Sequence, residues 1–250
     1  MSTKFEAQVA ADSRDRVATV ASHWWAGEAE VVRVYFSRPR TPESDLFWLT
    51  AQAYKESYPL RVLPKHVREE VLRNGGVAPA RGPAIETQLL QEAKHFKMLA
   101  DLVSELRRAP IDLAELKPLP QDLALQDLRA GFRDHGSDLD RAAIAFTEGG
   151  GGAMFWELTR IGDSAPEHRI AAIFREIYQD ELSHGWPHLE EIARHARCEA
   201  DWLRAEAIIC DISRQRLRMR NEMFGNPLDA TRVREIDEGR IEPWMAPSVI

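Results

Sequence analysis

The sequence predicts an all-α protein. Apolar residues recur with helical period over long stretches, whereas runs of alternating apolar and polar residues long enough for a strand are scarce. The segment Thr41-Pro42-Glu43-Ser44 has the form of an N-cap followed by a proline at the first helical position. Asn74-Gly75-Gly76 is typical of a helix end. These signals favour helices connected by short irregular segments.

The expected helices follow one another along most of the chain. The first covers about residues 4–36, with a break near Gly27, and Pro59 and Pro64 interrupt the second, which begins after Thr41. Further helices are expected at residues 84–108, 121–134, 139–161, 164–197 and 200–224. Residues 1–225 should form a single helical bundle domain, and residues 226–250 an irregular tail.

Composition excludes several classes of function. The chain has 250 residues, and its 44% hydrophobic and 29% charged residues are ordinary for a folded domain. The 33 Lys and Arg against 40 Asp and Glu give a net charge of -7, which argues against nucleic-acid binding. No apolar stretch approaches the roughly 20 residues that cross a membrane, and the N-terminal residues do not resemble a signal peptide. We therefore expect a cytoplasmic protein whose two cysteines, Cys198 and Cys210, remain thiols.

Two segments share the pattern Glu-x-x-His inside expected helices. One contains Glu92 and His95, and the other contains Glu181 and His184. Positions three apart lie on one face of a helix, so the carboxylate and the imidazole of each pair can reach one metal ion. Oxygen and nitrogen donors without a thiolate favour iron or manganese.

Each pair has a further glutamate upstream. Glu148 lies 33 positions before Glu181, and Glu56 lies 36 positions before Glu92. Two antiparallel helices joined by a loop bring residues at such separations level with one another. Glu28 and Glu30, in the preceding helix, are the alternatives to Glu56. The apolar residues that surround Glu148 predict a buried carboxylate, which is costly without a partner.

This pattern resembles the ferritin-like di-iron carboxylate superfamily, whose bundle offers a glutamate from each of two helices and a Glu-x-x-His from each of the other two. The resemblance covers the metal-bearing core at about residues 42–197. It implies a ferritin-like four-helix bundle with additional N-terminal, crossover and C-terminal helices. It also implies two iron ions, with manganese as the alternative metal: Glu56, Glu92 and His95 chiefly bind one ion, and Glu148, Glu181 and His184 bind the other.

An alternative ligand set lies on the expected helix at residues 164–197. Asp180, His184 and His188 are spaced four apart, which is similar to the series that heme-oxygenase-like di-iron oxidases use. In that arrangement Asp180 and His188 replace Glu56 and Glu181. Otherwise Asp180 or Asp211 would orient a ligand imidazole through its far nitrogen.

The resemblance implies an oxidoreductase, an oxidase or oxygenase that uses dioxygen to oxidise a small organic substrate. An external electron donor is an expected partner, because the sequence has no reductase domain or flavin motif, and a homodimer is compatible with these features. Two other hypotheses remain open. One is a ferroxidase or iron-handling protein, and the other is a metal-free helical scaffold.

Two further segments need an interpretation. Gly149 to Gly152 follow Glu148 inside an expected helix, at a propensity cost of about 1 kcal/mol for each glycine relative to alanine. We interpret them as space opened beside the metals for a substrate or oxygen, with a loop between two short helices as the alternative. Residues 213–220, with the sequence SRQRLRMR, are interpreted as a solvated helix face.

Overall fold

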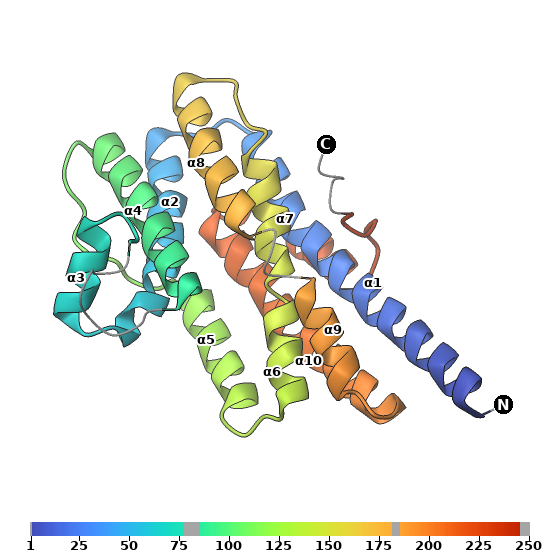
Figure 1. Cartoon of the computed structure of the whole chain (residues 1–250). Coiled ribbons are helices and arrows are strands. Elements are labelled where there is room, and N and C mark those ends of the chain that lie inside the picture. Colours follow the sequence, from blue (N-terminus) through green and yellow to red (C-terminus); the bar gives the residue numbers. More distant parts are fainter. Residues whose placement is uncertain (1, 78–85, 182–185, 246–250) are drawn as a thin grey trace. The chain divides into compact units, whose positions relative to one another are not determined.

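The computed structural model describes residues 2–77, 86–181 and 186–245, with side chains from residue 10 onward, and every regular element in these ranges is a helix (Figure 1). The predicted all-α class is therefore confirmed. Within the same ranges, no helix combines the length and the apolar character that crossing a bilayer requires.

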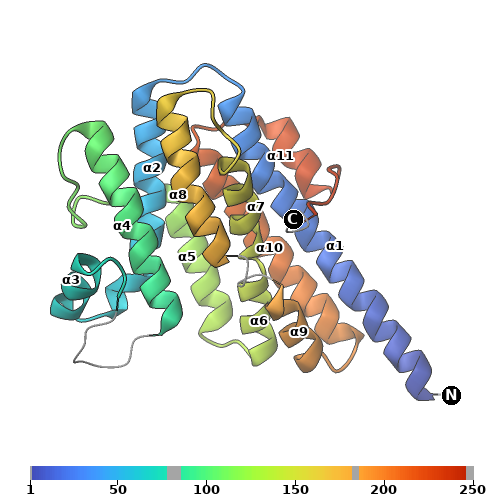
Figure 2. The ribbon, with the colours of Figure 1, turned by 45° about the horizontal axis from the view of Figure 1, so that its top comes forward.

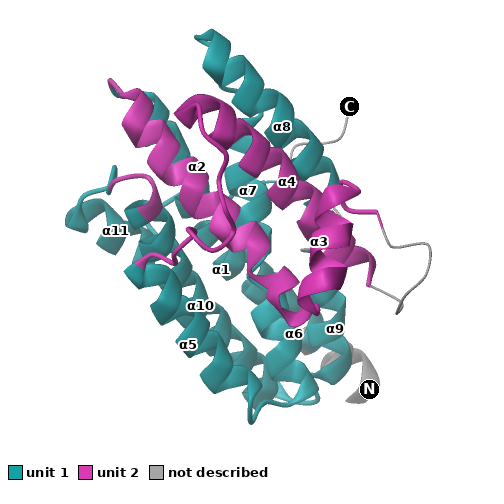
Figure 3. Cartoon of the chain, turned by 90° about the vertical axis from the view of Figure 1, so that its left-hand side faces the viewer, with its two compact units in different colours: residues 1–38, 120–222, 226–250 teal, residues 39–119, 223–225 magenta. Residues whose placement is uncertain are grey.

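The chain divides into two compact units (Figure 3). Unit 1 comprises residues 1–38, 120–222 and 226–250, and unit 2 comprises residues 39–119 and 223–225. Each unit has its own buried apolar side chains.

Unit 1 is built around the long helix α1, which lies beside α7 (Figure 2). Helix α7 also packs on α8, and α6 packs on α9. Trp25, Phe146 and Phe174 are among the largest fully buried side chains, and the Trp25 and Phe146 rings meet edge to face at 5.2 Å. The helices are α1 (Ser2–Phe36), α5 (Pro120–Arg133), α6 (Asp138–Phe146), α7 (Gly149–Leu158), α8 (Ala165–Glu181), α9 (Pro187–His195), α10 (Glu199–Met223) and α11 (Ala230–Asp237).

Unit 2 contains two long helices that pack together, and two shorter helices connect them in the sequence. Helices α2 (Pro42–Ser57) and α4 (Thr87–Arg107) pack along one another, and the 3₁₀ helix η1 (Pro59–Val62) and helix α3 (Lys65–Arg73) follow α2 (Figure 1). Trp48 and Leu49 of α2 and Leu99 of α4 are fully buried in this unit. Burial of these apolar side chains determines which face of α4 packs against α2.

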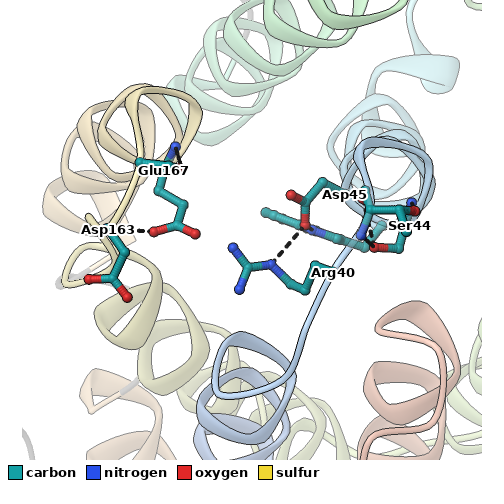
Figure 4. A network of polar contacts seen from close by, with 8 residues as sticks. Arg40, Ser44, Asp45, Asp163 and Glu167 are labelled. Carbon is teal, nitrogen blue, oxygen red and sulfur yellow. Dashed lines mark hydrogen bonds and ion pairs between the residues drawn. The ribbon is translucent and has the colours of Figure 1, made fainter.

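Local signals in the sequence set the start of α2 as predicted. The Ser44 N–H donates to Thr41 Oγ1 at 3.2 Å, and the Thr41 N–H donates to Ser44 Oγ at 3.1 Å, which is a complete capping box. Arg40 Nε donates to Asp45 Oδ1 at 3.3 Å beside this cap (Figure 4). Pro59 ends the α-helical part of the segment and begins η1, so the predicted interruption is confirmed.

The structure differs from the expected helices in several places. Helix α1 runs through Gly27 without a break. The expected helix at residues 139–161 is two helices, which meet at Thr147 and Glu148, so the glycine run begins α7 rather than forming a loop. The expected helix at residues 164–197 corresponds to α8 and α9. The segment expected to be an irregular tail contains α11, which Asp229 caps by accepting from the Arg232 N–H.

Candidate metal centre

Unit 2 brings three of the predicted ligands together. Glu56 comes from α2, and Glu92 and His95 come from α4, where their spacing of three places both on the face packed against α2. One ligand atom from each of these residues lies within 4.8 Å of the other two. The predicted partnership of Glu56 with the Glu92 and His95 pair is therefore present as a cluster of side chains.

Two of the three side chains of the cluster, Glu56 and His95, are buried, and Glu92 is half-buried. His95 is fully buried and Glu56 is 5% exposed, and His95 Nδ1 lies 3.5 Å from Glu56 Oε2. Gln52 Nε2, one turn earlier on α2, donates to Glu56 Oε1. Burial opposes ionisation of Glu56, but polar contacts with His95, Glu92 and Gln52 outweigh burial and lower the pKa of Glu56 to about 2. Glu56 is therefore an anion at neutral pH.

The donor atoms suit a metal ion. Carboxylate oxygens and imidazole nitrogens bind first-row metals at about 2.0–2.2 Å, so neighbouring ligands of a tetrahedral ion lie roughly 3.4 Å apart. The 3.5 Å between His95 Nδ1 and Glu56 Oε2 is close to this value. Two carboxylates and one imidazole favour iron, manganese or zinc over metals that prefer sulfur. The three residues therefore fit a metal ion of the predicted kind.

The other half of the predicted ligand set belongs to unit 1. Glu148 lies at the junction of α6 and α7, and Glu181 is the last residue of α8. Burial lowers the pKa of the buried Arg216, but Glu28, and then Glu148 and Glu181, raise the pKa of this guanidinium above its ordinary value. Both glutamates therefore lie within electrostatic reach of the same cation. His184 lies outside the described residues.

The two alternatives to Glu56 are held by arginines. Glu28 is fully buried and accepts from Arg216 Nε at 2.7 Å, from Arg216 Nη2 at 3.1 Å and from Arg220 Nε at 3.0 Å. Glu30 accepts from Arg232 Nε at 2.6 Å and from Arg232 Nη2 at 2.7 Å. Both carboxylates therefore have guanidinium partners within unit 1, whereas Glu56 lies beside Glu92 and His95 in unit 2.

The interpretation of residues 213–220 as a solvated face is wrong for its central arginines. Arg216 is 4% exposed and Arg220 is 3% exposed. A signal for their burial was present, because Arg216 continues the apolar stripe of Ile209 and Ile212 at helical spacing. Two cations on an apolar stripe indicate a buried acidic partner, and that partner is Glu28.

A third arginine lies in the same electrostatic environment. The Nε and Nη2 atoms of Arg129, on α5, are buried, and no residue in the described part of the chain accepts a hydrogen bond from them. Burial and the nearby charge of Arg216 lower the pKa of Arg129 to about 10, although Glu148 and Glu28 act in the opposite direction. Glu148 therefore lies within electrostatic reach of buried arginines as well as being a predicted ligand, and no residue near it in the sequence indicates these neighbours.

The first two residues of the glycine run make room for unit 1 side chains. A Cβ atom on Gly149 would lie 2.4 Å from the Trp25 ring, and one on Gly150 would lie 2.1 Å from Glu28 Oε1. A Cβ atom on Gly152 would meet nothing within 4 Å. Two of the four glycines are therefore needed because α7 lies close to α1.

The residues of the alternative ligand set lie on different elements. Asp180 is on α8, whereas His188 is on α9 and its Nδ1 is 2.8 Å from Glu191 Oε2. Asp211 is exposed on α10 and pairs with Arg214 at 3.0 Å. His188 and Asp211 thus have partners of their own, and His184, the middle member of the Asp180 series, lies outside the described residues.

Comparisons of the chain with protein families, with curated proteins and with solved structures find no match. Function is therefore inferred from the residues. Within the described residues, the structure is an all-α protein in which Glu56, Glu92 and His95 are close enough together to hold one metal ion.

Proposed function

We propose that the protein is an iron-dependent oxidase or oxygenase, with manganese as the alternative metal. The observation that carries the proposal is the convergence of Glu56, Glu92 and His95 to within 4.8 Å of one another in unit 2. A bound iron ion supplies chemistry with dioxygen that no side chain can perform. The ferritin-like bundle, the small organic substrate and the external electron donor belong to the same proposal.

The side chains of the cluster have distinct roles in binding the ion. Glu56 is already ionised, so its carboxylate binds a cation at neutral pH without releasing a proton. Gln52 fixes the orientation of Glu56 by donating to Oε1. Burial of His95 excludes water from its ring, which strengthens the attraction between the ligands and a cation.

A second ion would be held by Glu148, Glu181 and His184. Both glutamates raise the pKa of Arg216, which supports the proposal that they lie near one another within unit 1. The same observation supports a competing role, in which Glu148 and Glu181 only balance the charge of arginines. These roles predict different numbers of bound ions: two ions per chain if Glu148 and Glu181 are ligands, and one if they only balance the charge of arginines.

We expect the purified protein to bind ferrous iron in an anaerobic titration, and to change its optical spectrum when oxygen is admitted. Glu92→Gln and His95→Ala each remove a ligand and should weaken binding to unit 2 by about 100-fold or more, since loss of an outer partner alone costs about 10–100-fold. Metal content after dialysis, measured by elemental analysis, checks this result. Glu148→Gln should lower the content from two ions to one if a second ion is bound.

Two substitutions serve as matched controls. Glu105→Gln changes an exposed glutamate of the same helix, α4, and His66→Ala changes an exposed histidine of α3. Both variants should bind metal like the unmodified protein. Absence of iron and manganese from the unmodified protein under all loading conditions would contradict the proposal.

A further inference from the structure

Unit 2 contains a cavity of about 820 Å³ whose residues differ from those of the metal cluster. One wall is η1 and α3, the other is the connection at residues 112–118, and Tyr54 of α2 also contributes. The volume lies within the range of about 300–1,000 Å³ that is typical of small-molecule sites. None of the three proposed metal ligands lines it.

The cavity is positively charged. Arg61, Lys65, Arg68 and Lys117 line it against only two carboxylates, Glu69 and Asp112, although the whole chain carries a net charge of -7. The local excess of cations is therefore opposite in sign to the charge of the protein. Such a concentration of positive charge in a concave site attracts anions.

The two carboxylates do not cancel this excess. Asp112 Oδ1 accepts from the Ala114 N–H at 2.9 Å, so its carboxylate stabilises its own turn. Glu69 lies 3.8 Å from Lys65 Nζ, but both side chains are more than half exposed, which makes this pair weak.

An aromatic ring and aliphatic side chains complete the lining. The Arg61 guanidinium lies over the Tyr54 ring at 5.0 Å, which restrains the guanidinium. Leu72, Leu113 and Leu116 supply apolar surface. A ligand that satisfies both parts of the cavity has a negative group and an apolar body.

We propose that this cavity binds a small organic anion, in which a phosphate or a carboxylate contacts the arginines and lysines and an apolar body contacts the leucines and Tyr54. Guanidinium groups bind both kinds of anion through paired hydrogen bonds. The proposal is independent of the metal site, because the two sets of residues do not overlap.

Isothermal titration of the full chain with phenyl phosphate, phenylacetate and the neutral benzyl alcohol tests the proposal. At least one of the two anions should bind saturably with one site per chain, and the tighter of the two identifies the preferred head group. Benzyl alcohol should not bind. Arg68→Gln and Lys117→Gln should each weaken anion binding by roughly 10- to 100-fold, since each removes a charge-assisted contact.

Arg73→Gln is the matched control, because Arg73 is an exposed cation of the same helix, α3, that does not line the cavity. It should leave anion binding unchanged, as should Glu92→Gln, which separates this site from the metal site. Circular dichroism confirms that each variant is folded. No saturable binding of either anion at about 10 mM, or equal losses for Arg68→Gln and Arg73→Gln, would overturn the proposal.

Discussion

Glu28→Gln is expected to lower the free energy of unfolding by about 3–5 kcal/mol, the usual cost of removing one partner of a buried ion pair. Glu28 is the hydrogen-bonded counter-ion of both Arg216 and Arg220, and all three side chains are buried. Glutamine keeps the size of the side chain but leaves the two guanidinium charges without their anion. Chemical denaturation followed by circular dichroism measures the change.

The effect of this substitution should depend on pH. Burial opposes ionisation of Glu28, but the charges of Arg216 and Arg220 and their hydrogen bonds outweigh burial and lower the pKa of Glu28 below its ordinary value of 4.5. A carboxyl group with a lowered pKa in the folded state contributes stability above its unfolded pKa and loses it as the pH falls through its folded pKa. The difference in free energy of unfolding between the unmodified protein and Glu28→Gln should therefore have its largest value at pH 7. It should decrease as the pH falls below about 4.5.

Glu238→Gln is the control for Glu28→Gln. Glu238 forms an ion pair with Arg240, but the two side chains are 46% and 60% exposed. Such surface pairs contribute about 0–1 kcal/mol. If both glutamine variants lost equally little stability, the buried cluster would not be a major contributor to the stability of unit 1.

Gly150→Ala and Gly152→Ala should change stability in opposite directions. The new Cβ atom at position 150 would lie 2.1 Å from Glu28 Oε1, so α7 or Glu28 must move, at a cost of about 1–3 kcal/mol or more. The Cβ atom at position 152 meets nothing within 4 Å, and alanine stabilises a helix by up to about 1 kcal/mol relative to glycine. Thermal unfolding of the two variants measures the difference, which we expect to be about 2–4 kcal/mol.

These two positions also separate the two explanations of the glycine run. If the glycines created space for a ligand, alanine at either position would reduce ligand binding with little loss of stability. If they allow α7 to approach α1, the loss of stability should be confined to positions where a Cβ atom meets α1, as Gly149 and Gly150 do. A Gly150→Ala variant as stable as the unmodified protein would contradict the second explanation.

The sequence by itself determined the helical class, most helix positions and the composition of the cluster in unit 2. The cap at Thr41 and the i, i+3 spacing of Glu92 and His95 depend on residues within one or two helical turns, so they can be interpreted without a tertiary structure. Glu56 lies beside this pair because α2 and α4 pack along one another, although η1 and α3 separate them in the chain. Its role as a metal ligand stays a prediction.

Only the tertiary structure decided the roles of residues whose partners lie far along the chain. Glu28 and Arg216 are 188 positions apart, so nothing near Glu28 in the sequence shows that its carboxylate is already occupied. The same pairing buries arginines that were expected in solvent, and it requires glycine at position 150 because α7 packs against the helix that carries Glu28. Local periodicity determines which face of a helix is buried, whereas the charge and shape of that face's partner are properties of the other helices that meet it.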